Sequence, residues 1–212
     1  MLKFFTKLVF VLFLVNSCTH KPINNSAIEL KNLKTQIDTI FQNYIDNNYI
    51  NNDFLKYYDK VDVDCRNVNK ILYKVLKNDQ LARVASEIDM ETTDVENQSI
   101  VISIFDKCKD SFENLDEDSK EAVFLTIQHS GDVELTAYFY RYKSYFTNGE
   151  LALYVDRFLM CNNKPQIFGS QFHYVNGEVK LFKVSDKENL NHRRKIMGMT
   201  DIETYLESAK TN

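Results

Sequence analysis

The chain has 212 residues, of which 44% are hydrophobic and 13% aromatic, so one sizeable domain with a well-filled core is expected. The whole chain has 26 basic and 30 acidic residues, a net charge of −4. Without its first 17 residues, which include Lys3 and Lys7 and no acid, 24 basic and 30 acidic residues remain, a net charge of −6. That balance argues against a nucleic-acid partner. Only two prolines and five glycines interrupt the chain, which favours helices over a many-turned β sandwich.

The first residues are typical of an export signal. Lys3 and Lys7 precede the apolar run 8–15, which is too short to span a bilayer. The run ends at Val15-Asn16-Ser17-Cys18, which resembles the lipobox of bacterial lipoproteins. The resemblance implies cleavage before Cys18, lipidation of its sulfur and anchoring to a membrane, with residues 18–26 as a polar tether. We therefore expect a bacterial envelope protein facing the periplasm or the cell exterior. The alternative is an ordinary secretory signal with a coincidental cysteine.

Three further cysteines, Cys65, Cys108 and Cys161, permit at most one intrachain disulfide, and the sequence leaves its pairing open. No Cys-x-x-Cys pair occurs, and neither does His-Glu-x-x-His or any paired-histidine spacing. We therefore expect no metal and no other cofactor.

Hydrophobic spacing predicts a mostly helical chain after the tether. Asp79 is expected to cap a helical turn, residues 89–94 to form an acidic loop, and Asp118 with Glu121 to form a capping box. Asp132 is expected to cap the helix that follows His129. The predicted helices cover about 27–47, 53–60, 67–77, 95–108, 118–129, 132–145 and 151–161.

The C-terminal part contains the strongest hairpin signal. Asn176-Gly177 lies between alternating residues and predicts strands at about 170–175 and 178–183, with Val175 opposite Glu178. Two short helices are expected to follow, ending near Met197 and Ser208. The predicted fold class is α+β, predominantly α-helical with this one hairpin. The predicted parts are a signal peptide (1–17), a tether (18–26), an N-terminal helical region (27–78) and a second domain (79–208).

Asp156 and Arg157 lie in the middle of the apolar segment 151–161. An isolated buried charge costs several kcal/mol, so both side chains should meet opposite charges or dense hydrogen bonding. The sequence therefore predicts a polar centre around them. The alternative is an Asp–Arg pair that fixes the register of the helix and performs no chemistry.

Several separated motifs resemble a bacterial family known as domain of unknown function 6624, over roughly residues 79–206. Phe168 and Ser170 replace the family's usual tyrosine and threonine, and a Gly-Trp-Pro segment is absent near residues 109–115. The family has no assigned activity, so the resemblance implies none. The matching residues are Asp79-Gln80-x-x-Arg83, Asn97, Gln128-His129, Asp156-Arg157, Pro165-Gln166-x-x-Gly169-Ser170-Gln171, His192-Arg193-Arg194 and Gly198.

Three functions remain open at this stage. The first is an envelope lipoprotein that binds a small anionic ligand through Arg157, Gln166, Gln171 and Arg194. The second is a small hydrolase or transferase in which His129 acts as general acid or base beside an acid such as Asp156. The third is a non-catalytic scaffold lipoprotein whose polar residues form a structural network.

Overall fold

The computed structural model describes residues 25–85, 88–108 and 112–210. The predicted signal peptide, the predicted lipidation site Cys18 and most of the predicted tether lie outside these residues. No α-helix in the described ranges is both long and apolar enough to cross a membrane.

Helix α1 (Asn25–Asn47) forms where the sequence predicts it and contacts α5 and α7. It buries Ile37 and Phe41, and Phe41 stacks on the ring of Tyr140 at a centroid distance of 3.7 Å. The predicted weak helix after it is a single 3₁₀ turn, Phe54–Tyr57.

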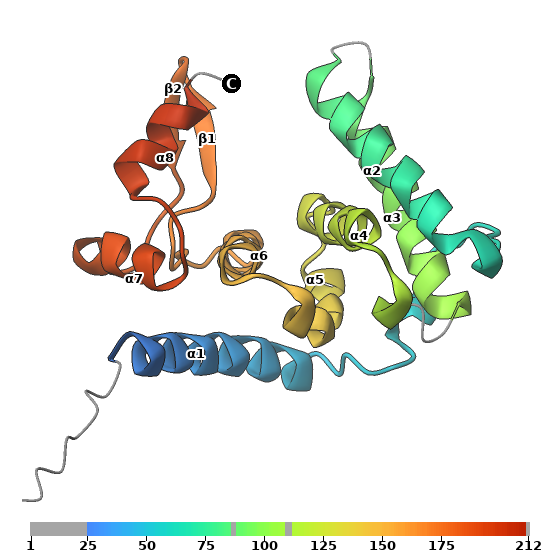
Figure 1. Ribbon diagram of the computed structural model, residues 1–212, viewed down its shortest axis with the longest axis horizontal. Helices are drawn as coiled ribbons and strands as arrows, with labels where there is room; N and C mark the ends of the chain where they lie inside the picture. Colours follow the sequence, from blue (N-terminus) through green and yellow to red (C-terminus); the bar gives the residue numbers. More distant parts are fainter. Residues whose placement is uncertain (1–24, 86–87, 109–111, 211–212) are drawn as a thin grey trace, which may run out of the picture.

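Helices α2 (Val68–Val84) and α3 (Met90–Lys107) lie side by side as an antiparallel hairpin (Figure 1). Two sequence predictions are wrong here. Asp79 is inside α2 and caps nothing, because the helix runs on through the predicted break. The predicted loop 89–94 is the first turn of α3, since the Asp89 side chain accepts a hydrogen bond from the Glu91 amide and caps that helix.

The disulfide Cys65–Cys108 joins the segment before α2 to the residue after α3. It therefore closes the base of the hairpin, at the opposite end from Asp79 and Asp94. Cys161 is the free cysteine of the described part and is partly buried.

Helices α4, α5 and α6 form the middle of the molecule (Figure 1). The cap of α4 is Asp116 instead of Asp118, because its carboxylate accepts from the Ser119 amide at 2.9 Å. The predicted cap Asp132 is confirmed, accepting from the Leu135 amide at 2.8 Å. Thr147 and Glu150 form a capping box at the start of α6. The bounds are Glu117–His129 for α4, Val133–Phe139 for α5, Tyr140–Tyr145 for the 3₁₀ helix after it and Asn148–Cys161 for α6.

The hairpin forms with the predicted register, in strands β1 (Phe172–Val175) and β2 (Glu178–Leu181). Val175 pairs with Glu178, and Asn176 and Gly177 both have positive φ, as a two-residue turn requires. Helices α7 (Leu190–Ile196) and α8 (Ile202–Ala209) follow. In Figure 1 this C-terminal group and the α2–α3 hairpin occupy opposite ends of the molecule.

The predicted fold class is confirmed: in the described residues a mostly helical chain carries a single two-stranded antiparallel hairpin. The main core draws residues from α1 through to Met197. The predicted boundary between residues 78 and 79 falls inside α2.

Candidate functional site

The structure separates the predicted polar centre into two clusters. The first, called here the Asp156 cluster, consists of Asp156 and the loop from Gln166 to Gln171. Asp156 on α6 is fully buried, with 0% of its surface exposed. Its carboxylate accepts hydrogen bonds from the amides of Ile167 at 2.7 Å, Phe168 at 3.0 Å and Ser170 at 2.8 Å. Burial raises the pKa of Asp156, and the three amides oppose that shift.

The two glutamines complete the loop. Gln166 donates to the carbonyls of Gln171 at 2.8 Å and Phe182 at 3.1 Å, and accepts from the Gln171 amide at 2.8 Å. Gln171 donates to the Ser170 hydroxyl at 3.0 Å. Gly169 supplies the positive φ of +65° that this turn needs. Both glutamine side chains therefore hold the loop closed.

Arg194 ties the same loop to the C-terminal helices. It is 1% exposed and donates to the carbonyls of Phe168 and Thr200, both at 2.7 Å. Its guanidinium lies 4.9 Å from the centre of the Tyr205 ring. Burial lowers its pKa, and the nearby Tyr205 and Asp156 oppose that shift. Arg194 is thus engaged within the protein and is not free to meet a ligand.

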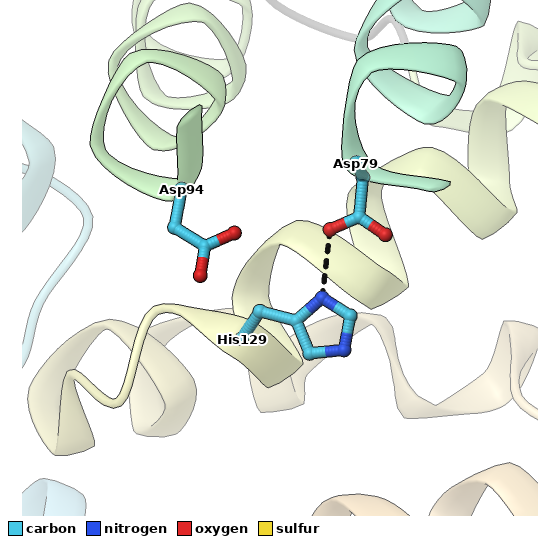
Figure 2. Close-up of side chains that lie close together, drawn as sticks. All are labelled: Asp79, Asp94 and His129. Atoms are coloured by element: carbon cyan, nitrogen blue, oxygen red, sulfur yellow. Dashed lines mark hydrogen bonds and ion pairs between the residues drawn. The ribbon is translucent and has the colours of Figure 1, made fainter. Parts of the chain in front are cut away.

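The second group, called here the His129 cluster, consists of Asp79 and Arg83 from α2, Asp94 from α3 and His129 from the end of α4. Figure 2 shows the imidazole directed at the Asp79 carboxylate, with Asp94 facing the same point from the neighbouring helix. The Nδ1 atom of His129 lies 2.7 Å from Oδ1 of Asp79. Nη2 of Arg83 lies 3.1 Å from that same oxygen and also binds Oδ1 of Asp94.

The hydrogen bonds of the His129 cluster fix the tautomer of the imidazole. An ionised carboxylate only accepts, so Nδ1 of His129 carries a proton, and in the neutral ring Nε2 carries the lone pair. Burial raises the pKa of Asp79, but the hydrogen bonds and charges of His129 and Arg83 outweigh it and hold the pKa below its ordinary value. Asp79 therefore stays ionised and keeps His129 in one orientation.

Arg157 lies one helical turn after Leu153 on α6, and the Leu153 carbonyl accepts a hydrogen bond from Gln128, the residue before His129. This contact between α4 and α6 places Arg157 near the end of α4 that carries His129. Burial lowers the pKa of Arg157, and the charges that act on it belong to Cys161 and Tyr205 as well as to Arg83 and Asp94. Within the described part of the chain its guanidinium has no hydrogen bond or ion pair, and its Nε is buried. It is a partly buried cation without a partner.

Three more buried polar atoms on α2 and α4 lack partners among the described residues: Nε of Arg83, Oγ1 of Thr126 and Oε1 of Gln128. Gln128 is 6% exposed and donates only a long 3.4 Å bond to the Leu153 carbonyl on α6. Buried polar atoms are normally paired, so unpaired ones mark positions where water or a ligand belongs. The Asp156 cluster contributes none of these atoms.

Asp79, Asp94 and His129 each offer one atom within 4.8 Å of the others, an arrangement that could hold a metal ion. Arg83, however, already places a nitrogen between the two carboxylates and supplies the positive charge that an ion would bring. A cation would have to displace Arg83, so the arrangement fits an acid–base pair better than a metal centre.

Three surface hollows in the described residues lie away from both clusters. The largest, about 630 Å³, lies between α1 and the segment 138–143, and its charged groups are already paired, Asp38 with Lys143 and Arg141 with Asn52. The other two measure about 530 and 280 Å³. None of the three is lined by a residue of either cluster.

The structure thus divides the predicted site residues between the two clusters. Asp156, Gln166, Gln171 and Arg194 share one cluster, while His129 and Arg157 belong to the other. The acid beside His129 is Asp79 instead of Asp156. The sequence indicates Asp79 as a helix cap and as part of the resemblance, Arg83 as part of the resemblance, and Asp94 as part of a loop, so it assigns none of them to this site. The available signal was the i, i+4 spacing of Asp79 and Arg83, which puts both on one face of a long helix.

Comparisons of the chain with models of known protein families, with curated proteins and with solved structures found no match. The resemblance to domain of unknown function 6624 therefore stays a prediction. Any functional inference for this chain rests on the geometry of the His129 cluster.

Proposed function

We propose that this chain is a lipid-anchored protein of the bacterial cell envelope that binds a small anionic ligand at the His129 cluster, with Arg157 as the cation that holds it. The observation that carries the proposal is the partly buried guanidinium of Arg157, which has no hydrogen bond or ion pair among the described residues and lies one turn along α6 from the contact with Gln128, the neighbour of His129. A charge kept partly out of water without a partner costs free energy, and an anion would remove that cost. A guanidinium also matches the planar fork of a carboxylate or the oxygens of a phosphate.

Arg157 is the ligand-binding candidate best suited to this role. Arg194 already donates to two carbonyls, and both glutamines hold the Gln166–Gln171 loop. We assign these three residues, together with Asp156, the scaffold role that was the third function left open. That role concerns the C-terminal half and is compatible with ligand binding at the other cluster.

Two features support the envelope location. The lipobox-like segment ending at Cys18 supports lipid anchoring. The disulfide Cys65–Cys108 supports an oxidising compartment, because such bonds are rare where thiols are kept reduced.

Anion binding is tested with Arg157→Gln, which keeps a polar side chain but removes the charge. Succinate and inorganic phosphate are titrated into the detergent-solubilised full chain by calorimetry. Arg66→Gln is the matched control, since that arginine is exposed and pairs only with Asp64. We expect at least about a tenfold loss of affinity in Arg157→Gln, the size of one charge-assisted hydrogen bond, and no loss in the control. Equal affinities in all three proteins would refute the assignment.

Lipid anchoring is tested separately with Cys18→Ala in a bacterial host. The natural chain should partition into the detergent-rich phase of a phase-separation assay and incorporate labelled palmitate. The Cys18→Ala chain should do neither. A natural chain found wholly in the aqueous phase would exclude the anchor and leave the ligand site unaffected.

A further inference from the structure

The Asp79–His129 pair has the arrangement of an oriented general base. Asp79 accepts from Nδ1 of His129, and it is itself held by Arg83 at 3.1 Å and by the side chain of Gln80 at 3.0 Å. A base oriented through one ring nitrogen presents the other, Nε2, to a substrate. In the described residues no group occupies Nε2, and the His129 side chain is 22% exposed. The imidazole is therefore held by Asp79 and is partly exposed to solvent.

The charges around His129 limit the substrate to one extra negative charge. Asp79 and Asp94 are both bridged by Arg83, so these three groups leave one negative charge. Arg157 makes no hydrogen bond or ion pair with them in the described residues, so it can pair with one negative charge of a substrate. A dianion such as a phosphate monoester would bring a second charge that faces the net negative charge of the other three groups, whereas a single carboxylate is paired with Arg157.

We propose that the chain hydrolyses carboxylic esters that carry a neighbouring carboxylate. This inference depends on the anion binding proposed above, because Arg157 would hold the substrate's carboxylate while its ester carbonyl lies beside His129. His129 is then the catalytic residue, Asp79 its positioning residue, and Arg157 the residue that selects anionic over neutral esters.

The step balances without any co-reactant other than water. Nε2 of His129 takes a proton from water as the water oxygen bonds to the ester carbonyl carbon. When the tetrahedral intermediate collapses, the bond from that carbon to the alcohol oxygen breaks. The proton on Nε2 passes to the leaving alkoxide, and the products are an acid and an alcohol.

The activity is tested with two matched probes, monoethyl succinate and ethyl butyrate, which share a four-carbon acyl group and differ in the carboxylate. Ethanol release by the full chain in detergent is followed by proton NMR. We expect faster turnover of monoethyl succinate. His129→Gln should lower its kcat by about a hundredfold or more, the usual contribution of a general base. His173→Gln, at an exposed position on the hairpin, is the matched control and should leave kcat unchanged.

The other two roles predict different kinetic signatures. Arg157→Gln should raise KM for monoethyl succinate about tenfold or more and leave ethyl butyrate unaffected. Asp79→Asn should lower kcat with little change in KM, and Asp79→Glu should recover part of it, because only a carboxylate fixes the tautomer. If Asp79 were only structural, Asp79→Asn and Asp79→Glu would both alter folding, and kcat would not fall selectively while KM stays the same. Circular dichroism and thermal unfolding confirm that each variant is folded.

Several outcomes would overturn the proposal. If succinate binds but neither ester is hydrolysed above the buffer rate, hydrolysis fails while the proposed anion binding stands. If succinate does not bind and no ester is cleaved, both fail. Activity abolished by a chelator and restored by Zn²⁺ would make Asp79, Asp94 and His129 metal ligands. Activity lost in Cys161→Ser would make that thiol the nucleophile instead of water.

Discussion

The two polar clusters each contain a carboxylate that is almost unexposed, Asp156 at 0% and Asp79 at 1%. Their surroundings differ. Asp156 accepts from three backbone amides of one loop, and every neighbouring polar side chain described above has its own partner. Asp79 binds side chains from two helices, and Arg157, one helical turn from the contact between α6 and Gln128, has no partner among the described residues. Burial of the charge therefore does not distinguish the two clusters, whereas incomplete pairing of the surrounding polar groups does.

Adjacent residues serve the two clusters. Asp156 and Arg157 are about 100° apart around α6, so the Asp156 side chain enters the C-terminal loop and the Arg157 side chain leaves the helix in another direction. A single helix thus carries both the structural anchor and the proposed ligand-binding cation.

The largest expected effect is the loss of Asp156. Asp156→Ala leaves three buried amides without an acceptor and should lower the free energy of unfolding by about 4 kcal/mol, measured by urea denaturation. Asp46→Ala, at an exposed position of α1, should change it by less than about 0.5 kcal/mol. A loss below about 1 kcal/mol in Asp156→Ala would remove the distinction between the clusters.

Removal of the disulfide comes next. Cys65→Ala with Cys108→Ala opens a bridge between residues 43 positions apart, and should lower the free energy of unfolding by about 3 kcal/mol. The bridge lies on the α2–α3 hairpin, so succinate affinity should fall while hydrogen-exchange protection of the Ile167 and Phe168 amides persists. Loss of protection at both places would show that the clusters unfold together.

Arg194 and Arg157 should respond in opposite directions to substitution by methionine, which keeps most of the side-chain volume. Arg194→Met leaves the carbonyls of Phe168 and Thr200 without a donor and should destabilise the protein by about 2 kcal/mol. Arg157→Met removes an unpaired charge and should stabilise it by about 1 kcal/mol, at the cost of anion binding. Destabilisation by both substitutions would mean that Arg157 is structural.

The smallest effect is the pH dependence contributed by Asp79. Its pKa is lowered in the folded protein from an ordinary value of 3.8, so the stability it contributes is present above about pH 4 and is lost as the pH falls through the lower folded value. The free energy of unfolding of the natural chain should therefore fall more steeply below pH 4 than that of Asp79→Asn. Parallel curves would contradict the stabilising contacts with His129 and Arg83.

Local signals in the sequence were sufficient for several elements. Asn176-Gly177 predicted the hairpin and its register, and Asp132 its helix cap, because each depends on neighbours within a few residues. Asp79 and Asp118 were misassigned, because a short polar residue can cap a helix or lie within one, and only the surrounding packing chooses.

By itself, the sequence determined that the chain is mostly helical with one hairpin, and that Asp156 and Arg157 enter an apolar helix. Only the tertiary structure decided which partners they meet. The loop after Pro165 folds back to give Asp156 its amides, and the α2–α3 hairpin brings Asp79 and Asp94 to His129 from 50 and 35 positions away in the chain. Helical periodicity depends on residues three or four apart, whereas such pairings depend on how whole helices pack, which no local pattern records.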